Sequence, residues 1–128
     1  MERELTKALR HLQLGPAELS VVFVGSRRMK ILNSRYRGLC KDTDVLSFPL
    51  LGEDVPQGPA VLGDIVISVP KALRQAKEFN VPFYEELRRL LVHGLLHLLG
   101  YDHETTAYQK RKMQQKERWL LDALAKVA

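Results

Sequence analysis

The chain has 128 residues, enough to bury one hydrophobic core without disulfides, so we expect a single domain spanning residues 1–128. Its hydrophobic fraction of 45% is typical of a packed globular protein, and no apolar run is long enough to cross a membrane. The first residues do not resemble a signal peptide, and the single cysteine, Cys40, cannot form an internal disulfide. We therefore expect a cytoplasmic protein that does not bind membranes.

The net charge of +5 comes from 20 Lys and Arg residues against 15 Asp and Glu residues. The excess lies partly in clusters such as "SRRMK" and "QKRKMQQKER". Basic proteins of this size often bind polyanions, but a charged run is more often a solvated helix face. Charge alone therefore favours RNA, DNA or acidic lipid only weakly.

Short runs rich in β-branched and aromatic residues predict strands at residues 18–24, 44–48 and 63–69. Between the first two strands, residues 26–37 predict a helix, with Ser26 as its N-cap and Gly38 just past its end. The stretch from residue 50 to residue 63 is rich in Pro and Gly, so we expect a loop within the one domain.

Helical periodicity then predicts helices at residues 71–80, 83–100 and 107–126, with Thr106 and Gln109 as a capping box for the last one. Since a helix joins the first two strands, we expect these strands to be parallel with a right-handed crossover. The third strand is expected to add antiparallel after the long loop. The sequence predicts an α+β domain in which helices cover a small mixed β-sheet.

Three of the four histidines lie in "HGLLHLLGYDH". His93 and His97 are four residues apart, so on a helix their rings project from one face about 40° apart. Gly100 can adopt the left-handed conformation that ends a helix, which lets His103 turn back as a third ligand. Three His ligands leave a coordination position open, as in catalytic zinc sites, where a bound water ionises near pH 7. The pattern predicts one Zn²⁺ ion on a metzincin-like metal-binding helix.

The same frame is the zinc-peptidase signature H-E-x-x-H-x-x-G-x-x-H, except that Gly94 stands where the peptidase has its catalytic glutamate. That glutamate takes a proton from the attacking water, which glycine cannot do. The change argues that the bond attacked is not a peptide, and a phosphodiester fits if a cation stabilises its charge. A peptidase remains an alternative if Asp102 or Glu104 acts as the base, although these acids also suit a turn and a helix start.

Other residues could complete a site. Arg37 could bind two phosphate oxygens, although an arginine there also suits the C-terminus of a helix. We expect Glu86 and Arg89, on the helical face of His93, to be surface or supporting groups rather than catalysts. Glu117 lies in the apolar row of the last helix, so we predict that it hydrogen-bonds the metal-site scaffold or a basic side chain. Trp119 is off that row and is expected to pack against the body of the protein rather than stack on bases.

Three blocks, "LNSRYRGLCKDTDVLSFP", "LGDIVIS" and "HGLLHLLGYDH", together resemble the YbeY family of bacterial endoribonucleases, from about Ser20 to the last helix. The resemblance implies a metal-dependent, single-strand-specific endoribonuclease. It implies action in ribosomal RNA maturation, especially at the 3′ end of small-subunit RNA, and in ribosome quality control. It places the zinc ligands on His93, His97 and His103.

The resemblance also gives a functional role to Arg37 and mainly structural roles to Asp44 and Asp64. We expect Arg37 and His93 to be the catalytic residues, with Arg37 neutralising charge on the phosphodiester. The expected partners are single-stranded RNA, ribosomal RNA and the small ribosomal subunit, with no DNA. A non-enzymatic ribosome assembly factor, whose zinc only staples the fold, remains an alternative.

Overall fold

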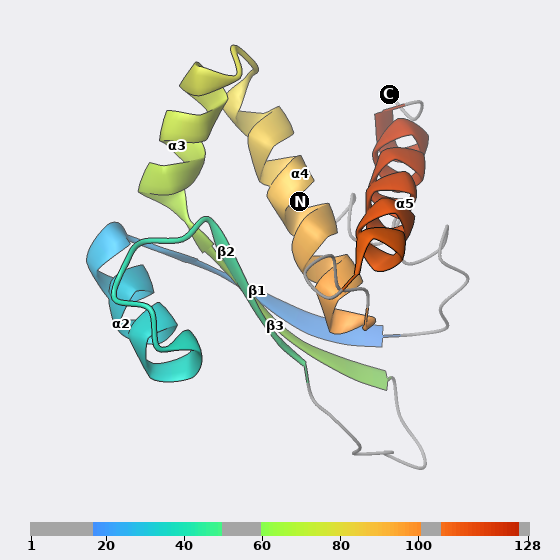
Figure 1. Cartoon of the computed structure of the whole chain (residues 1–128). Coiled ribbons are helices and arrows are strands. Elements are labelled where there is room, and N and C mark those ends of the chain that lie inside the picture. The colour runs from blue at the N-terminus through green and yellow to red at the C-terminus, as the bar shows by residue number, and fades with distance from the viewer. Residues whose placement is uncertain (1–16, 50–59, 101–105, 126–128) are drawn as a thin grey trace.

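The structure is a computed structural model that describes residues 17–49, 60–100 and 106–125. This part of the chain forms an α+β domain, as predicted, with a small mixed β-sheet covered by helices (Figure 1). The strands are β1 (Ala17–Val24), β2 (Val45–Pro49) and β3 (Ala60–Ser68). The helices are α2 (Ser26–Arg37), α3 (Val69–Glu78), α4 (Phe83–Leu98) and α5 (Ala107–Ala125). Each observed element overlaps the predicted one.

The strand order is β1-β3-β2, so β3 is the central strand. β3 pairs parallel with β1 and antiparallel with β2. The antiparallel pairing of the second and third strands is therefore confirmed. The prediction that the first two strands run parallel is wrong, because β3 lies between them and they point in opposite directions.

The connection from β1 to β2 explains this difference. α2 has 12 residues and carries the chain about 18 Å along the sheet at 1.5 Å per residue. Residues 39–44 follow outside any helix or strand, and six extended residues span about 20 Å in the opposite direction. The chain therefore re-enters the sheet at the end where β1 left it. The buried run Ile65–Ile67 of β3 then occupies the centre.

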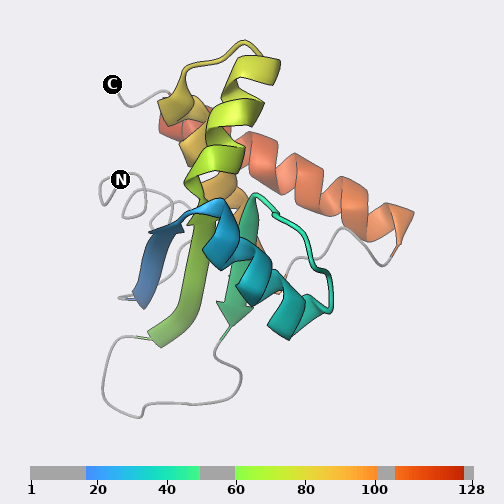
Figure 2. The same ribbon diagram turned by 90° about the vertical axis from the view of Figure 1, so that its left-hand side faces the viewer.

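Helices cover both faces of the sheet (Figures 1 and 2), and each face carries its own cluster of apolar side chains. On one face, Ile65 and Ile67 of β3 pack with buried leucines of α4 and with Leu120 of α5. On the other face, Val66 and Leu46 pack under Met29 of α2. α4 therefore lies directly on the sheet, on the side opposite α2.

Glycines end the helices where the sequence predicted. Gly38 caps α2 with a φ of 70°, and Gly100 follows α4 with a φ of 93°. The expected N-cap Ser26 is wrong, because Ser26 is already helical and Gly25 is the cap. The carbonyl of Gly25 accepts the first helical hydrogen bond, from the amide of Met29 at 3.1 Å.

One of the two hydrogen bonds of the capping box predicted for α5 is present. Thr106 Oγ1 accepts a hydrogen bond from the amide of Gln109 at 3.0 Å. This bond satisfies one of the amides that lack partners in the first turn of a helix. Among the described residues, no helix has the length and apolar composition that a membrane crossing requires.

Candidate functional site

Two histidines on α4 point their ring nitrogens at each other. The Nε2 atoms of His93 and His97 are 3.1 Å apart, and the ring centroids are 4.6 Å apart. Two nitrogens bound to one tetrahedral zinc at 2.0–2.1 Å would lie roughly 3.3–3.4 Å apart. The separation therefore fits two ligands of one metal ion, and the spacing argument for this pair agrees with the geometry.

Glu117 on α5 holds the other side of the His93 ring. Its Oε1 atom lies 2.5 Å from Nδ1 of His93. A carboxylate accepts hydrogen bonds, so Nδ1 of His93 is the donor in this contact, and the other ring nitrogen, Nε2, lies toward His97. Histidine ligands of metals are commonly oriented by a carboxylate in this way. Glu117 was predicted to hydrogen-bond the metal-site scaffold or a basic side chain, and its contact with His93 confirms that it has such a partner.

The third expected ligand, His103, lies outside the described residues, as do Asp102 and Glu104. Gly100, the last described residue before them, has the left-handed φ that a return of the chain requires. Within the described ranges, no third His, Cys, Asp or Glu joins the pair in a metal-binding group. The role of His103 and the two alternative bases therefore stay predictions.

Gly94 faces the sheet rather than open space. A Cβ atom at this position would lie 2.8 Å from Cγ2 of Ile65 and 3.3 Å from both Ser47 Oγ and Val45 Cγ2. The hydroxyl of Ser47 also donates to the carbonyl of Gly94 at 2.9 Å, which holds the helix close to β2. The packing of α4 on the sheet thus leaves no room for the glutamate of the peptidase signature. The peptidase alternative would depend entirely on Asp102 or Glu104.

An ion pair between a buried glutamate and a partly exposed arginine lies about one to two turns before His93 on the same helix. Glu86 is only 2% exposed, and its carboxylate accepts from Arg89 Nη2 at 2.5 Å and from Nε at 2.9 Å. Arg89 Nη2 also lies 3.9 Å from the carboxylate of Asp44. Glu86 is therefore not a surface group, and the pair supports α4 from inside.

Electrostatics around Arg89 link this pair to the histidines. Burial acts to lower the pKa of the guanidinium. The hydrogen bond and charge of Glu86, with the charges of Asp44 and Glu117, act in the opposite direction and outweigh it, so the pKa is raised. Arg89 is thus a permanent cation in the field of Glu117, the residue that holds His93.

The two aspartates with expected structural roles have definite contacts. Asp44 Oδ1 accepts from the amide of Val45 at 2.8 Å, at the start of β2. Its other oxygen lies 3.4 Å from the side-chain amide of Gln75 on α3. Asp64 is exposed on β3 and accepts a short hydrogen bond from Ser20 on β1. These contacts join neighbouring elements, although the functional roles of the two aspartates stay predictions.

Arg37 is the last residue of α2 and is exposed. The ring of its neighbour Tyr36 packs edge-on against Phe48 of β2, with 4.7 Å between ring centroids. The end of α2 therefore lies over the edge strand β2, on the sheet face opposite α4. A substrate that touches both Arg37 and the histidine pair has to pass this edge, and the catalytic role of Arg37 stays a prediction.

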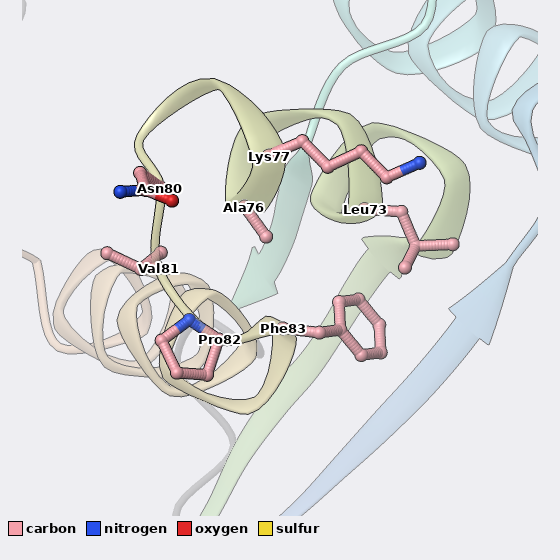
Figure 3. A pocket seen from close by; sticks show the side chains of 7 residues that line it. All are labelled: Leu73, Ala76, Lys77, Asn80, Val81, Pro82 and Phe83. Atoms are coloured by element: carbon pink, nitrogen blue, oxygen red, sulfur yellow. The ribbon is translucent and has the colours of Figure 1, made fainter.

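A pocket between α3 and the start of α4 is separate from the histidines (Figure 3). Lys77 is the only ionisable side chain that lines it, beside Asn80 and apolar neighbours such as Phe83. Phe83 begins α4, and His93 lies roughly 15 Å further along the helix axis at 1.5 Å per residue. The lining offers no metal ligands or proton-transfer groups at neutral pH.

Trp119 packs against the protein over part of its surface, as expected. Its side chain remains 44% exposed on α5. Nζ of Lys116 lies 4.3 Å from the centre of its ring. Sequence periodicity placed Trp119 off the buried row of α5 correctly, but it could not show whether another element covers the ring.

Comparisons with known proteins identify the family of this chain. The family model described as Endoribonuclease YbeY matches residues 1–125. A protein named Endoribonuclease YbeY from Thermodesulfovibrio yellowstonii is 51% identical over 106 residues, which cover 83% of this chain and 66% of the relative, just under two thirds of its length. The Aquifex aeolicus protein of the same name is 44% identical over 126 residues, which cover 98% of this chain and 83% of the relative.

A solved structure also matches. The solution structure of a protein from Thermotoga maritima superposes with a TM-score of 0.66 at 32% identity. The match covers 96% of this chain and 77% of that one. Since the family model spans nearly the whole sequence and the relatives are similar over most of it, the chain belongs to the Endoribonuclease YbeY family.

Proposed function

We propose that this protein is a zinc-dependent endoribonuclease that cleaves single-stranded RNA. Membership of a family named for endoribonuclease activity supports RNA as the substrate. The observation that carries the proposal is the pair His93–His97, with Nε2 atoms 3.1 Å apart and with Glu117 behind His93. A paired, carboxylate-backed set of imidazoles is a donor set that suits zinc.

His93 and His97 would hold the ion, with His103 as the third ligand. When bound, zinc would supply Lewis acidity toward a phosphate oxygen and a water of lowered pKa. Glu117 would keep His93 in the tautomer that presents Nε2. Arg37 would bind the phosphodiester and neutralise the charge that develops as the bond breaks.

The proposed substrate in the cell is ribosomal RNA, especially the 3′ end of the small-subunit RNA, in maturation and quality control of the ribosome. The small ribosomal subunit is then the partner, and the protein works in the cytoplasm. The family match and the net charge of +5 support this part of the proposal.

The direct test is cleavage of a defined single-stranded RNA by purified protein with zinc, beside the same RNA in a duplex. Arg37→Ala should lower the cleavage rate strongly, because the phosphodiester loses its cation. Arg28→Ala is the matched control, since Arg28 is another exposed arginine of α2. Equal cleavage by wild type and Arg37→Ala would refute the role of Arg37, and no zinc-dependent cleavage would refute the proposal.

His97→Ala separates an enzyme from a factor whose zinc only staples the fold. If the protein is an enzyme, the variant keeps its circular-dichroism spectrum and loses cleavage. If zinc is a staple, the variant unfolds. A casein digest sensitive to chelator would revive the peptidase alternative, which the packing around Gly94 disfavours.

A further inference from the structure

The outer surface of α5 carries much of the protein's positive charge. The helix contains five cations between Ala107 and Arg118, namely Lys110, Arg111, Lys112, Lys116 and Arg118. The only carboxylate in that span, Glu117, bonds His93 and so does not neutralise this surface. All of these cations except the half-buried Lys116 are exposed. The face complements a polyanion.

Two aromatic side chains lie among these cations on the same face of α5. Tyr108, Lys112, Gln115 and Trp119 follow one another at intervals of four, three and four residues, so they lie on one stripe of the helix. Tyr108 is 67% exposed and Trp119 is 44% exposed. Exposed aromatic rings beside cations are the arrangement on which single-stranded nucleic acids stack their bases.

The stripe also has a suitable length. Tyr108 and Trp119 are separated by about 16 Å along the axis, which corresponds to about five nucleotides at a stacked spacing of 3.4 Å. α5 packs against α4 on the side away from α3 (Figure 1). Glu117, which bonds His93, lies on the opposite side of α5 from the stripe, so the stripe faces away from the histidines. α2 is equally basic, but it covers the opposite face of the sheet.

We propose that the stripe Tyr108–Lys112–Gln115–Trp119 on the outer face of α5 is a binding track for single-stranded RNA. The idea rests on the proposed function and adds the surface that holds the strand. Bases stack on the rings of Tyr108 and Trp119, and phosphates pair with Lys112 and the neighbouring cations. The recognition tolerates any sequence, because every base has a face that can stack.

The chain offers a direct probe, because Trp119 is its only tryptophan. Single-stranded RNA of about twelve nucleotides, within the usual range of site sizes, is added to the whole protein. Tryptophan emission and the anisotropy of a label on the RNA are recorded together. The expected result is quenching of Trp119 that follows the same binding curve as the anisotropy.

A pair of double variants tests the track. Tyr108→Ala with Lys112→Ala should weaken binding about tenfold or more and lower the slope of log affinity against log salt by about one. The matched control is Phe79→Ala with Lys77→Ala, which removes an exposed aromatic from the C-cap of α3 and a cation from its last turn. The control should bind as the wild type does.

Two results would overturn the track: RNA binding without any change in Trp119 emission, or equal loss of affinity in both double variants. Cleavage is measured separately, so the two proposals fail in different ways. Intact binding and quenching without cleavage would refute the endoribonuclease and leave the track. Cleavage with unchanged affinity in the Tyr108 and Lys112 variant would refute the track alone.

Discussion

Replacing Gly94 by alanine tests the packing of α4 against the sheet. The new Cβ would lie 2.8 Å from Ile65 Cγ2 and 3.3 Å from Ser47 Oγ and Val45 Cγ2. Overpacking of a buried site usually costs about 1–3 kcal/mol, and the better helix propensity of alanine returns up to about 1 kcal/mol. We expect Gly94→Ala to lower the free energy of unfolding by about 1–2 kcal/mol.

The assay is urea unfolding followed by circular dichroism, in a double-mutant cycle with Ile65→Ala. Ile65→Ala alone should cost about 2–5 kcal/mol because it leaves a cavity. In that background, Gly94→Ala should be neutral or stabilising, since the clashing methyl group is gone, so the coupling energy is on the order of 1–2 kcal/mol. If Gly94→Ala is as stable as the wild type with Ile65 intact, the packing argument is wrong.

Gly94→Glu restores the peptidase signature and should be far less stable than the wild type, because a carboxylate enters an apolar contact. A folded variant that digests casein in a chelator-sensitive way would contradict this expectation. Glu117→Gln should weaken zinc binding about 10- to 100-fold in a chelator competition. The control is Asp122→Asn, which changes an exposed carboxylate on the same helix and should leave zinc binding unchanged. If the two variants bind zinc with equal affinity, Glu117 does not support the metal site. Arg89→Met leaves the carboxylate of Glu86 buried without its partner and should lower the free energy of unfolding by about 2 kcal/mol or more, and an unchanged urea midpoint would show that the pair does not stabilise α4.

Local patterns in the sequence predicted the helix that carries the histidine pair. The interval of four residues places His93 and His97 on one face of any helix, so their approach needed no knowledge of the rest of the fold. A partner for Glu117 could be predicted because a carboxylate in an apolar helical row requires one. The left-handed conformations of Gly38 and Gly100 followed from those open to glycine.

The features that the sequence did not predict depend on long-range packing. The order of strands depends on where residues 39–44 return the chain, and no local pattern encodes that path. The steric role of Gly94 appears only when Ile65 and Ser47 are in place against α4. The substitution in the peptidase signature was interpreted from chemistry alone, whereas the structure adds a packing reason for it.

The central claim is that the histidine pair binds the zinc that supports RNA cleavage. It is tested most directly by measuring zinc content and cleavage of a defined single-stranded RNA on the same preparations of wild type and His97→Ala. The account predicts one zinc per wild-type chain, cleavage that a chelator abolishes and added zinc restores, and a folded His97→Ala variant that lacks both. Wild-type protein that cleaves the RNA equally well without zinc would contradict it.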